Sequence, residues 1–255
     1  EYCTPECPDP RSLVIYDKAG EIIVQKLAEK VSVLNECDIA IHKKSSDGHG
    51  NASGCHENYS ISPELFKRLT TNPVRDPSVR AWATFLAVRQ ILTGGGKIGS
   101  EFSGANCPFQ ISQRADFIVA FRNNLTLTDR PVIQCRDEAL ADQKLVRRLH
   151  VIVGDTNMCE WAILLKTGLS ALMLMALETG YFETRKLPVF KDFVPKIIRS
   201  ISRDISFQKS YDTEPVNMSA IDILLHHLEA LTEFLSNDRP AYLSEELVSI
   251  YFDVL

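Results

Sequence analysis

The chain has 255 residues, of which 45% are hydrophobic and 24% charged, ordinary values for a globular protein of one large domain or two small ones. Its formal net charge of −5 leaves no broad basic surface, so non-specific binding to nucleic acid is disfavoured. The seven cysteines are odd in number and include no Cys-x-x-Cys pair. We therefore expect reduced thiols in a cytoplasmic protein.

The N-terminal part predicts a helix followed by a hairpin. Asp9-Pro10 starts the helix, because aspartate is a favoured N-cap and proline suits the first helical position. Apolar residues then recur at helical spacing as far as Val31. Residues 38–44 and 55–62 alternate as strands do, on either side of a loop rich in glycine, serine and aspartate. We expect these two strands to pair as a β-hairpin.

The remainder predicts further strands and a series of helices. Strand-like alternation occurs at residues 109–117, 132–136 and 149–153. The expected helices are a short one from Ser62-Pro63, one at residues 77–93 that ends at a triple glycine, and others at 158–179, 193–202, 220–236 and 244–255. This order predicts an α+β fold, with an antiparallel sheet and helices packed on one side of it.

One of these helices raises the question of a membrane span. Residues 161–177 are strongly apolar, but the run is short for a span and carries Lys166 near its middle. A buried core helix explains the run better. We therefore expect no membrane among the partners of this protein.

Two pairs of polar residues fall on the expected strands at a useful spacing. Alternate side chains of a strand share a face, so His56 and Asn58 point the same way, as do Arg148 and His150. Imidazole and amide groups suit a cation in an oxygen-rich shell next to phosphate or ribose, and arginine suits bidentate contact with phosphate. From the residues alone, a surface strand without a ligand explains His56 and Asn58 about as well as a binding site does. A basic strand end paired with a nearby carboxylate likewise explains Arg148 and His150.

Other charged or reactive residues indicate less. Arg114 and Arg136 fall on or after successive expected strands, and such charges are costly to bury without a ligand, so they favour one shared polar concavity. The Gly-Gly-Gly-Lys run at 94–97 lacks phosphate-loop spacing and follows a helix rather than a strand. Cys3 and Cys7 form no zinc site without further partners.

Five strings occur in the chain in this order: Glu-Tyr-Cys-Thr-Pro-Glu-Cys at 1–7, Asp-Lys-Ala-Gly-Glu at 17–21, Gly-Cys-His-Glu-Asn-Tyr at 54–59, Phe-Gln-Ile-Ser-Gln-Arg-Ala-Asp at 109–116 and Arg-Arg-Leu-His-Val-Ile-Val-Gly-Asp at 147–155. With these strings the chain resembles the Pup ligase and Pup deamidase/depupylase family over nearly its whole length. The resemblance implies a glutamine-synthetase-like fold, in which a curved antiparallel β-sheet holds ATP and Mg²⁺ and helices pack on its outer face.

The resemblance also implies roles for the residues that match the family's motifs. The implied Mg²⁺ ligands are Glu1, His56 and His150. The implied ATP contacts are Cys3, Thr4, Asn58 and Arg148. The family's catalytic aspartate lies upstream of Glu1, so we expect no catalytic residue within the chain and no activity from the chain alone.

The implied activity is ATP- and Mg²⁺-dependent deamidation of the C-terminal glutamine of the protein modifier Pup, with hydrolysis of the isopeptide bond between Pup and lysine. The amino-acid sequences of residues 4–6 and 109–117 are more similar to those of deamidases than to those of ligases in the family. The alternatives are a Pup–protein ligase that forms this bond and a non-catalytic Pup-binding relative. The implied partners are Pup, pupylated proteins and, indirectly, the bacterial proteasome.

The ends of the chain suggest that it is a fragment. It begins with Glu1 rather than methionine, and residues 247–255 still follow a helical pattern. With the resemblance, we interpret residues 1–235 as a large catalytic domain whose N-terminal strands are missing. We interpret residues 236–255 as the start of a truncated C-terminal helical region.

Overall fold

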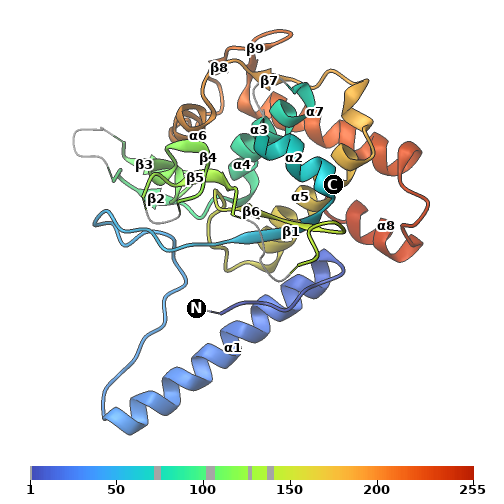
Figure 1. The fold of residues 1–255 in the computed structure, drawn as a ribbon. Coiled ribbons are helices and arrows are strands. Elements are labelled where there is room, and N and C mark those ends of the chain that lie inside the picture. Colours follow the sequence, from blue (N-terminus) through green and yellow to red (C-terminus); the bar gives the residue numbers. More distant parts are fainter. Residues whose placement is uncertain (1, 72–75, 102–106, 126–127, 137–140) are drawn as a thin grey trace.

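The computed structural model describes residues 2–71, 76–101, 107–125, 128–136 and 141–255. Figure 1 shows a sheet beside a group of helices, with the long first helix projecting away from them. Helix α2 (Pro63–Thr71) contacts strand β6 (Arg147–Val151) of this sheet, and helix α5 (Glu160–Glu178) contacts its strand β1 (Glu57–Ile61). The α+β fold expected from the sequence is therefore confirmed, with helices against one face of the sheet.

Helix α1 (Pro10–Asn35) begins as its sequence predicts. The Asp9 carboxylate caps it by accepting a hydrogen bond from Ser12 N at 2.8 Å, and the helix ends at Glu36, whose φ of 52° is left-handed. Its main contact is with α5 (Glu160–Glu178). Several large apolar side chains remain exposed along the rest of α1, so α5 is its principal support.

The main sheet has the strand order β1-β6-β5-β4. Strand β1 (Glu57–Ile61) runs antiparallel to β6 (Arg147–Val151), and β6 runs antiparallel to β5 (Pro131–Gln134). Strand β4 (Ala120–Asn123) joins β5 in parallel. The strands that carry the expected polar pairs thus form an antiparallel unit, and β4 adds a parallel edge that the sequence did not predict.

The predicted hairpin is wrong. Residues 38–44 form no strand, and the following loop has a single isolated bridge. Ile39 and Ile41 supplied the apolar alternation, yet they are 36% and 51% exposed, so this segment buries no face against a sheet. The second half of the prediction does form a strand, β1, but β1 pairs with β6, whose apolar face lies over the core.

The predicted strand that follows the triple glycine is also largely wrong. Strand β3 (Phe109–Gln110) forms at its start and pairs with β2 (Lys97–Ile98), but a 3-10 helix, η1, follows at Ala115–Phe117. Between them, the Asp155 carboxylate accepts from the backbone N–H groups of residues 113 and 114 at 2.8 and 3.0 Å. Groups bound in this way cannot join a strand ladder, so a buried side chain overrides the alternation.

The predicted helices form with small shifts of their ends, except that the single helix expected at residues 77–93 is divided at Arg89 into two helices. After β1 the helices are α2 (Pro63–Thr71), α3 (Pro77–Val88), α4 (Gln90–Thr93), α5, α6 (Val194–Arg203), α7 (Ala220–Glu233) and α8 (Glu245–Phe252). The smaller elements are η2 (Tyr181–Glu183), the π-helical turn η3 (Phe234–Asp238), and the strand pairs β7 (Val189–Phe190) with β9 (Thr213–Glu214) and β8 (Ser210–Tyr211) with β10 (Met218–Ser219).

Helix α5 lies in the centre of the core. Its Leu169 and Leu172 are fully buried, in one cluster with Trp82 and Phe85 of α3. The helix is long and apolar enough to cross a membrane, but 61% of that stretch is buried inside the protein. Lys166 is buried as well and donates to the Asp155 carbonyl at 2.7 Å. In this fold α5 is the core helix that its sequence predicts.

The last helix packs on the same core as the rest of the chain. Val254, just after α8, lies against Gly168 of α5, where an added Cβ would be 3.0 Å from the valine. Val248 and Tyr251 of α8 belong to the buried cluster. The division of the chain at residue 235 stays a prediction.

His227 provides a pH-dependent test of this core. Its side chain on α7 is fully buried, and burial lowers the pKa of its imidazole from 6.5 to about 4. As the pH falls, the unfolded chain binds this proton first, so the contribution of His227 to the free energy of unfolding is complete above 6.5 and declines toward pH 4. Urea unfolding over this range should show the decline, and His227→Gln should reduce it. An equal decline in the variant would assign it to other groups.

Candidate functional site

One face of the sheet gathers polar residues that the sequence predicted. In the register of β1 with β6, Asn58 lies opposite His150, and Ser60 lies opposite Arg148. Arg148 Nη1 donates to Asn58 Oδ1 at 3.3 Å, and its Nη2 donates to the carbonyl of Arg136 at 3.3 Å. The predicted same-face pairs thus meet across two neighbouring strands.

His56 precedes β1 and completes this group. Its ring centroid lies 4.8 Å from that of His150, with the two rings at 69°. The exposed His56 side chain lies over Gly54, where any Cβ would overlap the imidazole, so this close approach requires glycine. Below, the polar cluster means His56, Asn58, Arg148 and His150.

Gln134 on β5 is part of the site and was missed by the sequence analysis. Its Oε1 lies 2.7 Å from Nδ1 of His150, and its Nε2 donates to the Asn124 carbonyl at 3.3 Å. With the amide oxygen turned to the ring, Nδ1 of His150 carries the proton and donates it, which leaves a lone pair on Nε2. That Nε2 is buried and has no hydrogen-bond partner. In the sequence, Gln134 stands two residues before Arg136 and so shares its strand face. Its contact with His150 becomes visible only when β5 pairs with β6.

Burial keeps the His150 imidazole neutral. The side chain is 6% exposed, and burial, followed by the charges of His56 and Arg148, lowers its pKa to about 4. A neutral ring with a bare, oriented Nε2 can ligate a metal ion at neutral pH. The orphaned nitrogen therefore fits the predicted metal role of His150.

Glu57 and Tyr59 point to the opposite face of β1, as predicted, and enter the helix layer. The Glu57 carboxylate forms a two-point ion pair with Arg89, at 2.7 Å to each oxygen, and accepts from the Tyr59 hydroxyl at 2.7 Å. Arg89 also donates to the Lys166 carbonyl at 3.0 Å and to the Ser170 hydroxyl of α5. This buried pair joins β1, the α3–α4 junction and α5 directly behind the polar cluster.

The protonation states of this pair follow from its surroundings. Burial alone would raise the pKa of the Glu57 carboxyl, but the charge and hydrogen bonds of Arg89 hold it below its usual value. Burial and the Glu57 charge raise the pKa of Tyr59 well above its usual value. Glu57 is therefore an ionised acceptor, and Tyr59 is a neutral donor to it.

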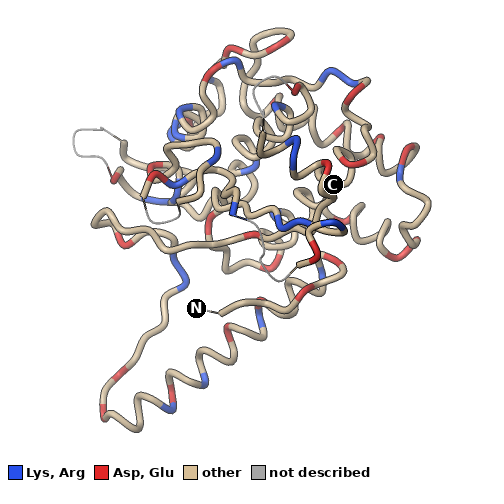
Figure 2. Tube along the Cα trace, viewed as in Figure 1, with Lys and Arg blue, Asp and Glu red and all other residues tan. Residues whose placement is uncertain are grey.

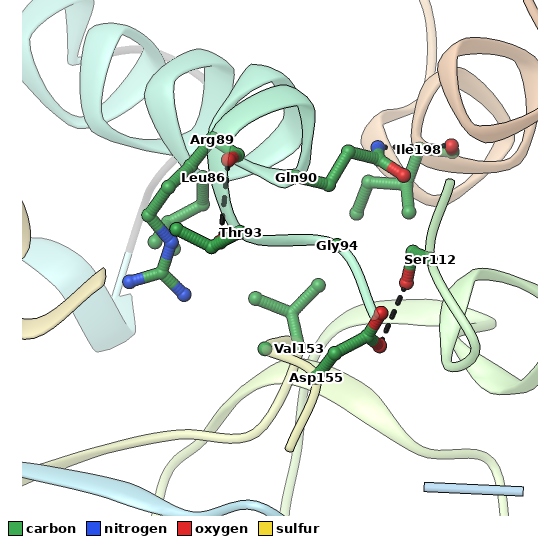
Figure 3. Close-up of a pocket in the computed structure, with 10 residues that line it drawn as sticks. Leu86, Arg89, Gln90, Thr93, Gly94, Ser112, Val153, Asp155 and Ile198 are labelled. Carbon is green, nitrogen blue, oxygen red and sulfur yellow. Dashed lines mark hydrogen bonds between the residues drawn. The ribbon is translucent and has the colours of Figure 1, made fainter. Parts of the chain in front are cut away.

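Asp155, shortly after β6, fixes the loops behind the sheet. Its carboxylate accepts from Gly95 N at 2.8 Å, from Ser112 Oγ at 2.9 Å and from Arg114 N at 3.0 Å. Asp155 and Ser112 line a cavity of about 10 Å³, and Figure 3 shows the hydrogen bond between them. The expectation that Arg114 lines the polar face is wrong, because its buried side chain donates to the Ile152 carbonyl at 3.0 Å. Arg114 supports the end of β6 instead.

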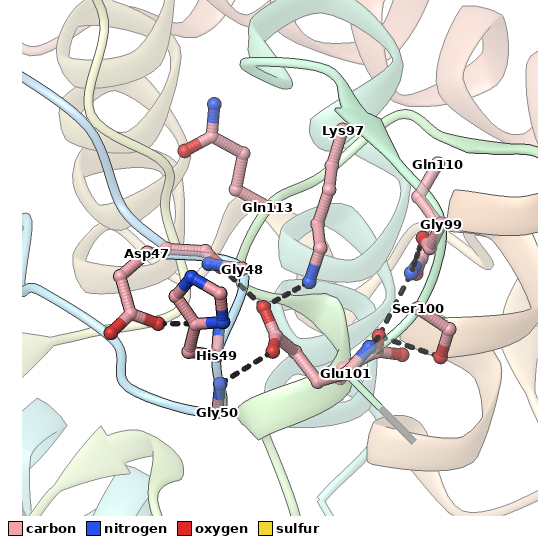
Figure 4. Close-up of polar contacts among 12 residues, drawn as sticks. Asp47, Gly48, His49, Gly50, Lys97, Gly99, Ser100, Glu101, Gln110 and Gln113 are labelled. Atoms are coloured by element: carbon pink, nitrogen blue, oxygen red, sulfur yellow. Dashed lines mark hydrogen bonds and ion pairs between the residues drawn. The ribbon is translucent and has the colours of Figure 1, made fainter. Parts of the chain in front are cut away.

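The loop that leads to His56 is anchored to the region of β2 (Figure 4). The Glu101 carboxylate accepts from Gly50 N at 2.9 Å and from the Ser46 hydroxyl, and it pairs with Lys97. Gly50 has a φ of 91°, which glycine adopts without strain. His56 thus depends on a loop anchor, whereas His150 depends on a strand.

The N-terminal segment lies along α1. The Tyr2 hydroxyl donates to the Tyr16 carbonyl at 2.9 Å. Cys3 is exposed and Thr4 is partly buried, and the side-chain hydrogen bonds of Tyr2 and Cys7 are made to the carbonyls of Tyr16 and Pro5, not to the polar cluster. Glu1 lies outside the described residues. The nucleotide and metal roles of these three residues stay predictions.

The polar cluster fits a phosphate-bearing ligand together with a cation. Arg148 offers a guanidinium to phosphate, Asn58 offers an amide, and the two imidazoles offer nitrogen ligands. Among the residues that the structure describes, no group of three His, Cys, Asp or Glu side chains could hold a metal ion by itself. Because Mg²⁺ prefers an octahedral shell of oxygen, it would take most of its ligands here from phosphate and water.

Comparison with known proteins decides the family. Residues 1–255 match the family model described as Pup-ligase protein. The chain belongs to the Pup ligase family. A depupylase of Acidothermus cellulolyticus is 35% identical over 245 residues, 93% of this chain and 45% of the relative. A Pup–protein ligase of Kineococcus radiotolerans is 36% identical over 252 residues, 93% of this chain and 51% of the relative.

The fold also matches solved structures of this family. The Pup ligase PafA in complex with ADP has a TM-score of 0.77 at 29% identity, over 100% of this chain and 55% of that chain. The complex between Pup and its ligase PafA has a TM-score of 0.74 at 31% identity, over 98% and 50%. The glutamine-synthetase-like fold expected for this Pup ligase family member is thereby confirmed. The chain spans about half the length of these relatives.

The buried Glu57–Arg89 pair gives a stability prediction. Arg89→Met leaves an unpaired carboxylate in the core and should lower the free energy of unfolding by about 3–5 kcal/mol. The double variant Glu57→Gln/Arg89→Met removes both charges and should regain part of this loss. Arg239→Met breaks an exposed ion pair with Glu245 and, as the control, should cost less than about 1 kcal/mol. Urea denaturation measures all three, and similar losses for Arg89→Met and the control would contradict the prediction.

Proposed function

We propose that the protein is an ATP- and Mg²⁺-dependent enzyme that deamidates the C-terminal glutamine of Pup and hydrolyses the isopeptide bond between Pup and lysine. The observation that carries the proposal is the polar cluster, which places a guanidinium, an amide and two imidazoles on one sheet face of a Pup ligase family chain. Both family activities concern Pup, and the matching PafA structure contains ADP.

Each residue of the polar cluster has its own part in this proposal. Arg148 binds phosphate oxygens, and Asn58 orients its guanidinium through the 3.3 Å hydrogen bond. His56 and Nε2 of His150 would hold Mg²⁺, and Gln134 keeps the His150 ring in the required tautomer. When bound, Mg²⁺ and the nucleotide supply the charge that polarises the scissile carbonyl.

The remaining expected residues lie at and before the start of the chain. Glu1 is the further Mg²⁺ ligand of the proposal, and Cys3 and Thr4 are its further nucleotide contacts. The aspartate that attacks the carbonyl or activates water is expected upstream of Glu1.

The amino-acid sequence of residues 4–6 and 109–117 favours the deamidase and depupylase activity. Ligation of Pup to lysine is the second candidate, because the PafA structures match the chain over 98–100% of its length. Overall identity does not separate the two, at 35% to a depupylase and 36% to a ligase. A Pup deamidase/depupylase of Mycobacterium tuberculosis, 40% identical over 71% of this chain and 34% of the relative, supports the first candidate.

The same proposal extends to partners and location. Pupylated proteins are substrates of the hydrolysis, and the bacterial proteasome is an indirect partner because it receives such proteins. All seven cysteines are free thiols, which suits the reducing cytoplasm.

The activity is tested by giving the protein, at its natural length, ATP, Mg²⁺ and three substrates in separate reactions. These are Pup ending in glutamine, a Pup–protein conjugate, and Pup ending in glutamate with a lysine-bearing acceptor. Mass spectrometry that finds glutamate formed from glutamine and acceptor released from the conjugate supports the proposal. New conjugate without either hydrolysis assigns the ligase, and Pup binding without turnover assigns a non-catalytic relative.

The nucleotide role of the polar cluster is tested by two neighbouring arginines. Arg148→Ala should weaken ADP binding roughly 10- to 100-fold, since charge-assisted hydrogen bonds contribute about 1.5–3 kcal/mol. Arg147→Ala removes the same charge from the opposite face of β6, where the guanidinium lies 4.3 Å from the Phe66 ring centroid. This control should change ADP affinity less than about threefold. Equal losses in calorimetric titrations would remove Arg148 from the site.

A further inference from the structure

A basic hollow lies along α6, and α6 contacts β4, the strand at the opposite edge of the sheet from β1. Its volume is about 520 Å³, and its lining residues are Lys196, Arg199, Ser200, Arg203, Asp204 and Lys209. Four of these six residues are cations and one is a carboxylate, although the chain as a whole has a net charge of −5. Figure 2 shows Lys and Arg gathered at the position of α6. We call this feature the α6 hollow.

The turn after α6 forms the second wall of the hollow and is held by hydrogen bonds. The Asp204 carboxylate accepts from the Ser206 hydroxyl at 2.7 Å and from Lys209 N at 3.1 Å. Phe207 in this turn has a φ of 56°, an unfavourable conformation for a bulky residue. The turn brings Lys209 Nζ to 2.6 Å from the Ser200 hydroxyl of α6. Strain of this kind persists where surrounding contacts hold it, often at functional sites.

The arginines of the hollow retain unused hydrogen-bond donors. Arg199 donates to the Ile118 carbonyl at 2.9 Å, and Arg203 Nη2 donates to Asp116 at 2.6 Å. Arg203 Nε is buried and has no hydrogen-bond partner. Since a guanidinium has five donors, both side chains can bind a further acceptor while keeping these contacts.

A solvated polar face is the ordinary explanation for cations on an amphipathic helix. It does not account for the hollow shape or the strained turn at Phe207. Residues 196, 199 and 203 follow one face of α6 over about two turns. Cations spread in a row complement a row of carboxylates, whereas a single phosphate needs donors that converge on one point.

We propose that the α6 hollow is an interaction surface for a carboxylate-rich segment of a protein partner. Aspartate or glutamate side chains of that segment pair with Arg199 and Lys209, and with Lys196 in exchange for its exposed ion pair with Asp192 at 2.7 Å. Because the hollow and the polar cluster lie at opposite edges of the sheet, the segment docks without covering the nucleotide face. The inference does not depend on which reaction the polar cluster performs.

The test uses a fluorescein-labelled oligoglutamate peptide and fluorescence anisotropy. Lys196→Gln/Lys209→Gln neutralises two exposed cations of the hollow, and Lys26→Gln/Lys30→Gln makes the same charge change on the exposed face of α1. The first double variant should bind the peptide roughly tenfold more weakly, and the second should change the affinity less than about twofold. Circular dichroism checks that both variants are folded.

Three results would overturn the proposal. Absence of peptide binding at low ionic strength removes the surface altogether. Equal losses in the two double variants assign the binding to overall charge rather than to the hollow. Displacement of the peptide by inorganic phosphate, where sodium chloride of equal ionic strength has no effect, assigns a small-anion site in place of a protein surface.

Discussion

The ion pair between Glu57 and Arg89 is the contact on which the arrangement of the site depends. Two charges buried behind the sheet are tolerable only when each satisfies the other. The pair reaches from β1 to the α3–α4 junction, and Arg89 continues to the carbonyl of Lys166 on α5. A slip of β1 by one residue would turn Glu57 to the polar face and bury Asn58. The pair thus fixes the register that sets the polar cluster.

The two faces of the sheet consequently have different electrostatic roles. Behind it, the buried carboxylates are fully engaged: the ionised Glu57 by Arg89, and Asp155 by backbone and hydroxyl donors. In front of it, His150 is neutral and Arg148 presents its charge beside Asn58. A rigid, satisfied layer supports a face on which the buried Nε2 of His150 has no hydrogen-bond partner, and rigid support of this kind is what a preorganised binding site requires.

Much of this could be predicted from the sequence, and the failures have physical causes. The period-two rule placed His56 with Asn58, and Arg148 with His150, on one face, and it turned Glu57 to the other. Apolar alternation shows neither whether a segment is buried nor which strand it pairs with. Residues 38–44 were therefore predicted to be one strand of a hairpin, although they bury no face. The residue types alone did not indicate which ligand the polar face binds, and the expectation of ATP and Mg²⁺ came from the resemblance to the family.

Two other features required three-dimensional information. Asp155 reaches the backbone of residues far away in the sequence and cancels a strand that their alternation predicted. Gln134 acquires its role from the pairing of β5 with β6, which brings its amide to His150. Neither contact leaves a local pattern in the sequence, because both depend on which strands and loops become neighbours.

The anchoring of the two imidazoles has a consequence for ligand affinity. His150 is part of a central strand, whereas His56 follows a loop tied by Glu101 to the region of β2. Loops of this kind open at lower free energy than the central strands of a sheet. A ligand held by both rings must therefore meet the free energy of keeping the loop closed, and any partner that stabilises the closed loop raises the affinity of that ligand. The contacts of Glu101 with Gly50, Ser46 and Lys97 therefore contribute to the affinity of any such ligand.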